Sequence, residues 1–572
     1  MIGGKSVRQR RGGDQWLQTL LMVIMIVILF VSILLPLYGL FSKAFTDENG
    51  QFIGISNFIH YFDTPALAQS FNNTLYISSV TTVITVILAF AFAYAINRSQ
   101  IRGKMLFRYI ALLPLFAPTM MHGIALTYLF GKQGLITTGF FGALPFSWDI
   151  GLYGATGIII SEVIYAFPQA FLILSVALAV SDNRLYEAAE TLGAGQLRKF
   201  ATVTLPNMKY GLVSAIFVCF TISFTDFGAP KVVGGQFNVL ATDIYKQVVG
   251  QQNMGMGATV GILLTLPALL AFIVDRFVER KQSARITAKS TPYRIQDGRM
   301  RDTLSYVYCI LIVTLILILN LTVILAAFIK VWPYQLSLTW KHFDFTQTAG
   351  EGLTPFWNSL TVSIYTAVIG TMLTFGFAYL IEKIRFWRGL RQVGYFLSII
   401  PLALPGMVIG LAYIFFFNNP DNPLHAIYGT AIIIVLANIV HFYSVPFITA
   451  TTALKKLDKE FELVSESMRV PFYKTFFRVT VPMSLPAILE IASYFFVNAM
   501  VTISAVVFLY AADFKLASVA IVNMDDAGDI APAAAMSLLI LVTNILVRIL
   551  YEVVTRNLRK RTEAWQNTSH KM

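Results

Sequence analysis

The sequence predicts an all-α membrane protein of about twelve transmembrane helices, arranged as two parallel repeats. Three observations support this class. Hydrophobic residues make up 56% of the 572 residues and charged residues 13%, whereas soluble domains carry about 25% charged residues. Apolar runs long enough to cross a bilayer as a helix, about 20 residues each, recur along the whole chain. Short motifs also recur between the two halves at a nearly constant spacing.

The apolar runs predict six spans in each half. The first six are expected at 16–40, 71–97, 107–131, 153–181, 208–229 and 256–279, and the second six at 303–331, 357–381, 394–417, 426–453, 484–510 and 532–554. The polar stretch 280–302 contains no apolar run and is expected to be a cytoplasmic linker. The two domains are therefore expected at 1–290 and 291–572.

The distribution of basic residues predicts that both termini are cytoplasmic. With the N-terminus inside, only seven of the 43 Lys and Arg residues fall in outer segments: Lys43, Lys132, Lys231, Lys246, Lys330, Lys341 and Lys515. Basic residues concentrate in cytoplasmic loops of membrane proteins. Membrane topology thus explains the net charge of +13, and we expect no nucleic-acid partner.

No residue pattern predicts chemistry on this chain. Cys219 and Cys309 both fall in apolar spans, where they are expected to pack, and no metal-ligand cluster or triad of nucleophile, base and acid is visible. Residues 3–6, Gly-Gly-Lys-Ser, lack the upstream glycine and the preceding strand of a phosphate-binding loop. We expect no catalytic residues, no metal site and no cofactor here.

Two pairs of motifs define the repeat. FNNTL at 71–75 opens the second span, and FWNSL at 356–360 opens the eighth. LPLFAP at 113–118 in the third span matches IPLALP at 400–405 in the ninth. We call these two nearly equal spacings the span offsets. Six spans separate the copies, so both halves begin on the same side of the membrane and share an axis along its normal. The paired prolines predict kinks in the third and ninth spans.

The loop between the fourth and fifth spans, at 182–206, contains the most specific motif. It reads Glu187-Ala188-Ala189, three residues, Gly193, nine residues, and then Val-Thr-Leu-Pro. This spacing resembles the EAA loop of ABC-importer permeases. The resemblance implies that a short loop helix docks on a separate ATPase subunit. Gly193 would permit a sharp turn at the end of that helix. The alternative is an ordinary interfacial helix that covers the loop ends.

The second half contains a degenerate copy of this loop, because the segment 458–482 corresponds to 182–206. We call the spacing between these two loops the loop offset. Glu466 corresponds to Glu190, but Arg469 stands where Gly193 would be, and Leu463 stands at the position of Glu187. Glu462 is expected to serve in place of Glu187 by a shift of one residue. The two ATPase contacts are therefore not expected to be equivalent.

Further motifs narrow the resemblance to permeases of ferric-iron and 2-aminoethylphosphonate importers. FTDFGAP at 224–230 and the fusion of both halves in one chain fit either branch. SAVVFLY at 504–510 and NMDDAGD at 523–529 are more similar to the aminoethylphosphonate branch. The resemblance therefore implies a small polar cargo, with 2-aminoethylphosphonate first and ferric iron second.

Ionisable groups inside spans are candidates for the translocation pathway. Glu162 is the clearest, although a hydrogen bond within the bundle would explain it equally well. Asp226 and Thr502 correspond under the loop offset and are candidate gate residues, unless the turn that contains Asp226 simply ends the span. Weaker candidates, for which structural roles are favoured, are Glu382, Glu490, His122 and His441.

The resemblance implies the permease of a type I ABC importer in a bacterial inner membrane. A homodimeric ATPase holding ATP and Mg, a periplasmic binding protein and membrane lipid would be its partners. Spans 1 and 7 are expected to wrap the outside of the bundle. Two parallel six-span halves also describe a secondary transporter, which would leave the EAA loop unexplained. A scaffold without transport has no supporting feature. The chain itself is not expected to be an enzyme.

Overall fold

The computed structural model describes residues 13–569 apart from residues 48, 146, 180, 284–290, 292, 296, 347, 349–351, 384–386, 459 and 513. The middle of the expected linker and the boundary between the expected domains therefore lie outside the described residues. The first half contains α1 (Gly13–Leu29), α2 (Leu35–Ala44), α3 (Ser56–Asp63), α4 (Pro65–Arg98), α5 (Lys104–Ala111), α6 (Thr119–Phe130), α7 (Gly139–Gly142), α8 (Ala155–Ala179), α9 (Asn183–Thr191), α10 (Gln196–Lys199), α11 (Leu205–Thr225), α12 (Gly228–Val233), α13 (Leu240–Tyr245) and α14 (Met254–Ser283).

The second half repeats this order of helices and adds one hairpin. It contains α15 (Arg299–Phe328), β1 (Ile329–Val331), β2 (Gln335–Leu338), α16 (Thr354–Lys383), α17 (Arg388–Ile399), α18 (Gly406–Phe417), α19 (Ala431–Phe442), α20 (Ser444–Lys455), α21 (Glu460–Ser467), α22 (Phe472–Thr475), α23 (Val481–Met483), α24 (Leu485–Val501), α25 (Ala517–Asp526) and α26 (Ile530–Ser569). Strands β1 and β2 pair antiparallel, with Ile329 opposite Leu338. Each half also contains a single π-helical turn, at Phe200–Thr204 in the first and at Phe476–Thr480 in the second. These two turns are equivalent under the loop offset.

The expected twelve spans appear as eight long helices and four bent pairs. Eight helices are long and apolar enough to cross a membrane, and the bent pairs raise the possible number to twelve. The third and ninth spans bend by 101° and 112°, as their prolines predicted. The tenth and eleventh spans bend by 57° and 78°, which corrects the continuous spans expected there. The fifth and eleventh spans also end earlier than expected, at Thr225 and Val501.

Prolines account for the two unexpected bends. Pro446 and Pro486 have no N–H group, so the carbonyl groups four residues earlier lose their helical partners. The breaks follow those carbonyls directly, between Phe442 and Ser444 and between Met483 and Leu485. Tyr210 occupies the first-half position of Pro486, and the helix Gln196–Thr225 continues through it. Pro486 therefore makes the two halves differ in shape at the fifth and eleventh spans.

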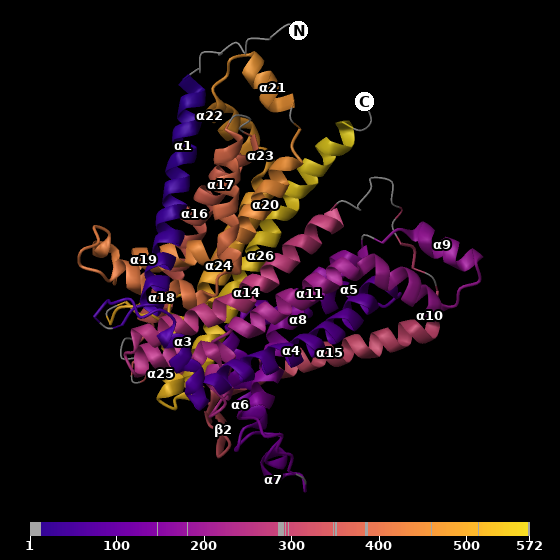
Figure 1. Cartoon of the computed structure of the whole chain (residues 1–572). Coiled ribbons are helices and arrows are strands. Elements are labelled where there is room, and N and C mark those ends of the chain that lie inside the picture. Colours follow the sequence, from indigo (N-terminus) through magenta and orange to yellow (C-terminus); the bar gives the residue numbers. More distant parts are fainter. Residues whose placement is uncertain are drawn as a thin grey trace.

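The first span of each half packs against the opposite half. Helix α1 contacts α16 and α17, and α2 contacts α18, where Tyr413 donates to the Ser32 carbonyl oxygen at 2.9 Å. Helix α15 contacts α4, α5 and α6, where Tyr308 donates to the Leu88 carbonyl oxygen at 2.9 Å. Both helices lie at the periphery of the molecule (Figure 1), as expected for spans 1 and 7. The exchange between halves was not expected.

The two helical bundles diverge like the sides of a V. In Figure 1, α4, α8 and α15 extend toward α9, whereas α16, α20 and α26 extend toward α21. One hydrophobic core contains buried residues of both halves, including Met120, Phe227, Leu411 and Met500. This shared core joins the two bundles, while the two loop helices, α9 and α21, lie far apart at the open ends.

Candidate coupling and translocation site

Loop helix α9 is capped at both ends, although the sequence predicted only the turn at Gly193. Asp182 precedes it and accepts the Arg184 N–H at 3.1 Å, which satisfies a free donor of the first turn. This hydrogen bond and the Thr291 hydroxyl hold the pKa of Asp182 below its usual value. At the other end, Gly193 has φ +72°, and the Gly193 and Ala194 N–H groups bond the carbonyl groups of Glu190 and Ala189 at 2.9 Å each. This is the Schellman arrangement of a helix end.

Loop helix α21 has the same caps in spite of its degenerate sequence. Asp458 accepts the Glu460 N–H at 3.1 Å. Arg469 takes the left-handed conformation of Gly193, with φ +55°. The Arg469 and Val470 N–H groups bond the carbonyl groups of Glu466 and Ser465 at 3.1 and 2.9 Å. The second loop therefore keeps the backbone conformation of the first, although arginine replaces the glycine.

The residue in the left-handed conformation differs between the two loops, and the effect of this difference on stability can be tested. A residue with a Cβ costs about 1 kcal/mol in this conformation, so Arg469→Gly should slow local opening of α21, measured by amide hydrogen exchange, by about fivefold. Arg184→Gly is the matched control, because Arg184 lies in the first turn of α9, where glycine costs about 1 kcal/mol. It should speed the opening of α9. Faster exchange in the Arg469→Gly variant would contradict the assignment of strain.

The segment that joins the halves binds α9 directly. Asn183 donates its N–H to the Thr291 carbonyl oxygen at 3.0 Å, and its side-chain oxygen accepts the Arg294 N–H at 3.0 Å. The Thr291 hydroxyl donates to Asp182 at 2.9 Å. The expected linker is thus docked at this point, and it holds the N-terminus of the first loop helix.

A basic residue at the end of the second span of each half contacts the loop helix of that half. Arg98 ends α4 and donates to the Leu178 carbonyl oxygen at 3.0 Å and to the Tyr186 hydroxyl at 3.5 Å. Its guanidinium lies 3.6 Å from the centroid of the Tyr293 ring, a cation–π contact. Lys383 ends α16, corresponds to Arg98 under the span offset, and lies 3.0 Å from Glu462 of α21.

Glu462 does not take the position expected for it. It corresponds to Tyr186 under the loop offset, and its side chain is only 15% exposed beside Lys383, which is 8% exposed. Glu187 is instead exposed on α9, where it accepts from the Asn183 side chain at 2.6 Å. Glu462 therefore fastens the second loop helix to its span, and the one-residue shift is a wrong interpretation of its place.

Both loop helices present apolar side chains to solvent. Leu192 and Met468 occupy equivalent positions at the helix ends and are 85% and 70% exposed. Glu466 and Ala188 are also exposed, and Ala189 is partly exposed. Each loop helix therefore leaves an apolar side chain uncovered at its C-terminal end. The two helices thus offer related, but not identical, contact surfaces.

A cavity of about 310 Å³ lies between the two halves. The first half lines it with Tyr165, Asp226 and Asp275, and the second half with residues that include His441, Tyr494 and Ser504. Helix α18 begins at the same cavity, because Pro405 and Gly406 line it. Among the described residues that line this cavity, none is a lysine or an arginine.

The predicted pathway residues fall at different depths around this cavity. Asp226 lines it and accepts the Ala229 N–H at 2.9 Å. Glu162 is fully buried on α8. Thr502 directly follows α24 as Asp226 directly follows α11, both with extended backbone, but Thr502 is not among the lining residues. His122 is buried, and Glu382 lies 4.0 Å from Lys455.

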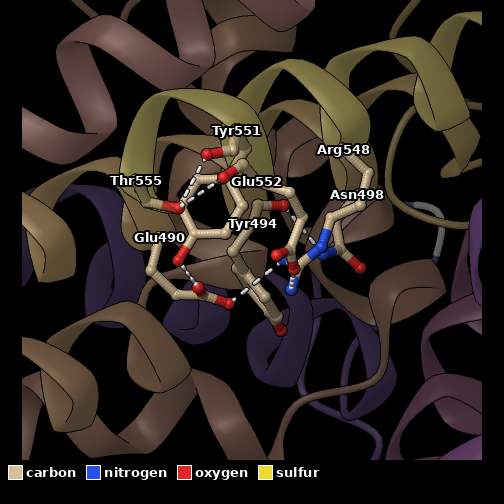
Figure 2. Close-up of polar contacts among 7 residues, drawn as sticks. All are labelled: Glu490, Tyr494, Asn498, Arg548, Tyr551, Glu552 and Thr555. Carbon is tan, nitrogen blue, oxygen red and sulfur yellow. Dashed lines mark hydrogen bonds and ion pairs between the residues drawn. The ribbon is translucent and has the colours of Figure 1, made fainter. Parts of the chain in front are cut away.

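Glu490 has structural partners near the end of its span. In Figure 2 it approaches Arg548 and Tyr551 of α26, with Arg548 at 3.3 Å and the Tyr551 hydroxyl donating to it. Ser214 and Asp275 occupy the equivalent first-half positions, and Ser214 donates to Asp275 at 2.5 Å. The fifth and sixth spans of each half are therefore tied by a hydrogen bond to a carboxylate. The carboxylate lies on opposite helices in the two halves.

In each half, a glycine contacts a residue with a hydroxyl group close to the cavity, and the two positions are exchanged between the halves. A Cβ atom at Gly228 would lie 2.1 Å from the Thr119 hydroxyl oxygen, and one at Gly406 would lie 2.2 Å from the Ser504 hydroxyl oxygen. Thr119 and Gly406 are equivalent under the span offset of the proline motifs, and Gly228 and Ser504 under the loop offset. Each half therefore pairs one glycine with one hydroxyl residue, on opposite sides of the contact.

Sequence reasoning missed Arg98, Lys383 and the docked segment around Tyr293. The first two had a usable signal, because each is the last residue of its span and they share the offset of the motifs that open those spans. Tyr293 had none, because nothing in a polar stretch predicts a cation–π contact with a residue so far away along the chain.

Comparisons with known proteins agree with this architecture. Residues 86–284 and 375–560 each match the model of the family described as binding-protein-dependent transport system inner membrane component. The chain is 28% identical over 559 residues to the ferric transport system permease protein FbpB of Actinobacillus pleuropneumoniae, covering 96% of this chain and 79% of the relative. It is 28% identical over 512 residues to a putative ferric transport permease, FbpB 1, of Haemophilus influenzae, covering 88% and 79%.

A solved bacterial ABC transporter involved in alginate import matches with a TM-score of 0.40 and 18% identity, over 48% of this chain and 96% of that chain. The family model covers most of both halves, and it matches twice. The chain therefore belongs to the family of binding-protein-dependent transport system inner membrane components, as an ABC-importer permease with both halves fused in one polypeptide.

Proposed function

We propose that this permease works in a bacterial inner membrane, with both termini in the cytoplasm, and is driven by a homodimeric ATPase that holds ATP and Mg. The observation that carries the proposal is the pair of equivalently capped loop helices with exposed apolar ends, Leu192 and Met468. Two related surfaces suit two copies of one partner. Each helix is tied to a span through Arg98 or Lys383, so closure of the ATPase dimer would move the spans.

The proposed cargo is 2-aminoethylphosphonate, delivered by a periplasmic binding protein. This molecule carries an ammonium and a phosphonate group. The cavity offers the carboxylates of Asp226 and Asp275 from one half and the N-terminus of α18 from the other. Carboxylates attract an ammonium group, and a helix N-terminus attracts a phosphonate. The two chemical ends of the cargo would thus contact different halves.

Ferric iron is the second candidate. The two relatives named above are ferric transport permeases. The cavity also places the phenol groups of Tyr165 and Tyr494 near the same carboxylates, and oxygen ligands suit hard cations. The N-terminus of α18 would not help to bind a cation, whereas it would help to bind a phosphonate. This difference distinguishes the two proposed cargos.

Uptake into vesicles that carry the permease, its ATPase and its binding protein tests both cargos. Asp226→Asn keeps an oxygen for the Ala229 N–H but removes the charge, and we expect about a tenfold loss of aminoethylphosphonate uptake, since hydrogen bonds to charged groups are worth about 1.5–3 kcal/mol. The exposed Asp149→Asn variant is the matched control and should transport normally. Glu187→Ala should reduce uptake through the loop, with cargo binding unchanged.

The outcomes separate the alternatives. Uptake of iron that falls in the Asp226→Asn and Glu187→Ala variants would support the permease function and show that the cargo is iron. Uptake that persists without the ATPase would indicate a secondary transporter and overturn the proposal. Equal transport by the Asp226→Asn and Asp149→Asn variants would remove Asp226 from the pathway.

A further inference from the structure

A second, larger cavity lies between the halves on a different side of α14. Its volume is about 1040 Å³, and it is bounded by α14 of the first half and α17 of the second, with Phe41 of α2 also lining it. Most of its wall is apolar: Phe41, Leu269, Phe272, Ile273, Phe277, Phe396, Ile399, Ile400, Ala403 and Leu404. We call this the lateral groove.

The lateral groove lies along a different face of α14 from the smaller cavity. Along α14, the cavity of about 310 Å³ is lined by Ala268, Ala271 and Asp275, whereas the groove is lined by Leu269, Ile273 and Phe277. Helical periodicity places these two sets on different faces. The two cavities meet at Phe272, Ala403 and Leu404, which line both. The groove set is 38%, 41% and 62% exposed, as is usual for side chains that contact acyl chains in a spanning helix. The groove is therefore a side opening between the halves.

One end of the groove is strongly basic. Arg276, Arg388, Arg391 and Lys455 line it there, together with a single acidic residue, Glu382. Glu382 lies 4.0 Å from Lys455, and Arg391 donates its Nε–H to the Ile381 carbonyl oxygen at 2.6 Å. Arg388 begins α17 and Lys455 ends α20, so this rim lies where the spans meet the surface that carries α21.

We propose that the lateral groove is a binding site for one anionic phospholipid of the leaflet on the side of the loop helices. Its acyl chains would cover the apolar wall, and its phosphate would lie among Arg388, Arg391 and Lys455. Basic pockets between spans at this membrane surface suit anionic headgroups. A neutral lipid would offer no net negative charge to Arg388 and Arg391, and a free phosphate would leave the apolar wall uncovered. A lipid in this place holds the two halves apart along the side of the V.

Native mass spectrometry of the purified full chain tests this site. Phosphatidylglycerol and phosphatidylcholine are titrated in parallel, and we expect phosphatidylglycerol to bind more tightly. Each basic residue near the headgroup is worth about fivefold in affinity, so Arg388→Gln/Arg391→Gln should reduce the preference by about twenty-five-fold at most. Arg102→Gln/Arg108→Gln is the matched control, since these exposed residues lie just before α5 and within it, outside the groove. Glycerol phosphate, added as a competitor, should not displace the lipid.

A second measurement keeps the test valid if the double variant folds poorly. A tryptophan introduced by Leu269→Trp reports on the groove in an otherwise unchanged chain, and Leu550→Trp, on an exposed face of α26, is its control. Brominated phosphatidylglycerol should quench the first more than brominated phosphatidylcholine does, with no difference at the second. Equal quenching by both lipids at position 269, or equal loss of preference in both double variants, would overturn the site. Displacement by glycerol phosphate would indicate an anion site without lipid.

Discussion

Replacing Lys383 with methionine is expected to release helix α21 from its bundle and to separate ATP hydrolysis from uptake. Lys383 and Glu462 are 8% and 15% exposed and lie 3.0 Å apart. Removal of one partner leaves the other charge in a poorly hydrated place, which costs about 3 kcal/mol or more. Helix α21 can avoid that cost by moving Glu462 into water, away from α16. In the function proposed above, motion of the ATPase would then no longer reach the second half.

The measurement combines amide hydrogen exchange over α21 with ATPase activity and uptake of the reconstituted complex. Faster exchange and retained hydrolysis without uptake are the expected result. Lys455→Met is the matched control, because Lys455 is 59% exposed and lies 4.0 Å from Glu382, and exposed pairs contribute about 0–1 kcal/mol. Lys383→Met/Glu462→Leu should recover most of the stability. Similar mild effects of both methionine variants would contradict a fastening role for the pair.

Gly228→Ser is expected to reduce both stability and uptake, and Thr119→Gly is expected to restore them. The Cβ of a serine at position 228 would overlap the Thr119 hydroxyl, 2.1 Å away, and approach Met120 to 3.1 Å. Overpacking of this kind costs about 1–3 kcal/mol, and here it would displace the turn that contains Asp226. We expect a loss of uptake of tenfold or more. The double variant recreates in the first half the arrangement of Gly406 and Ser504.

The two single variants and the double variant form a double-mutant cycle. Thermal unfolding in detergent measures their stability, and uptake into vesicles measures their transport. Gly376→Ser is the control, because a Cβ there meets no atom within 4 Å. The interaction energy of the pair should reach about 1–3 kcal/mol, the range for residues in contact. An additive result, with the double variant as poor as the sum of its parts, would show that the alternating contact is incidental.

The spacing of repeated motifs predicted much of the fold. In a parallel repeat, two residues separated by the offset occupy equivalent positions in the two halves. The span offsets and the loop offset correctly aligned the spans that begin at Pro65 and Thr354, the broken helices, and the two loop helices. The span offset also aligns Arg98 with Lys383. Composition alone supplied the membrane class.

Other features depend on contacts that no local pattern contains. The exchange of α1 and α15 between halves depends on which faces pack together, and both helices are apolar around most of their surface. Glu462 was misplaced because the sequence shows the residue type, whereas the structure shows that it points toward Lys383. The bend at Pro486 did have a signal in the sequence, since Tyr210 stands at the equivalent first-half position.

The exchange of the first spans has a consequence for how this protein is made. Helix α15 covers α4, α5 and α6, yet it is synthesised only after all six spans of the first half. Helix α1, the first to enter the membrane, has its partners α16 and α17 only later still. Neither half can therefore mature alone on the ribosome, and the first half must wait in the bilayer with an uncovered face. A single continuous chain makes this wait short, because the covering helix always follows in the same molecule.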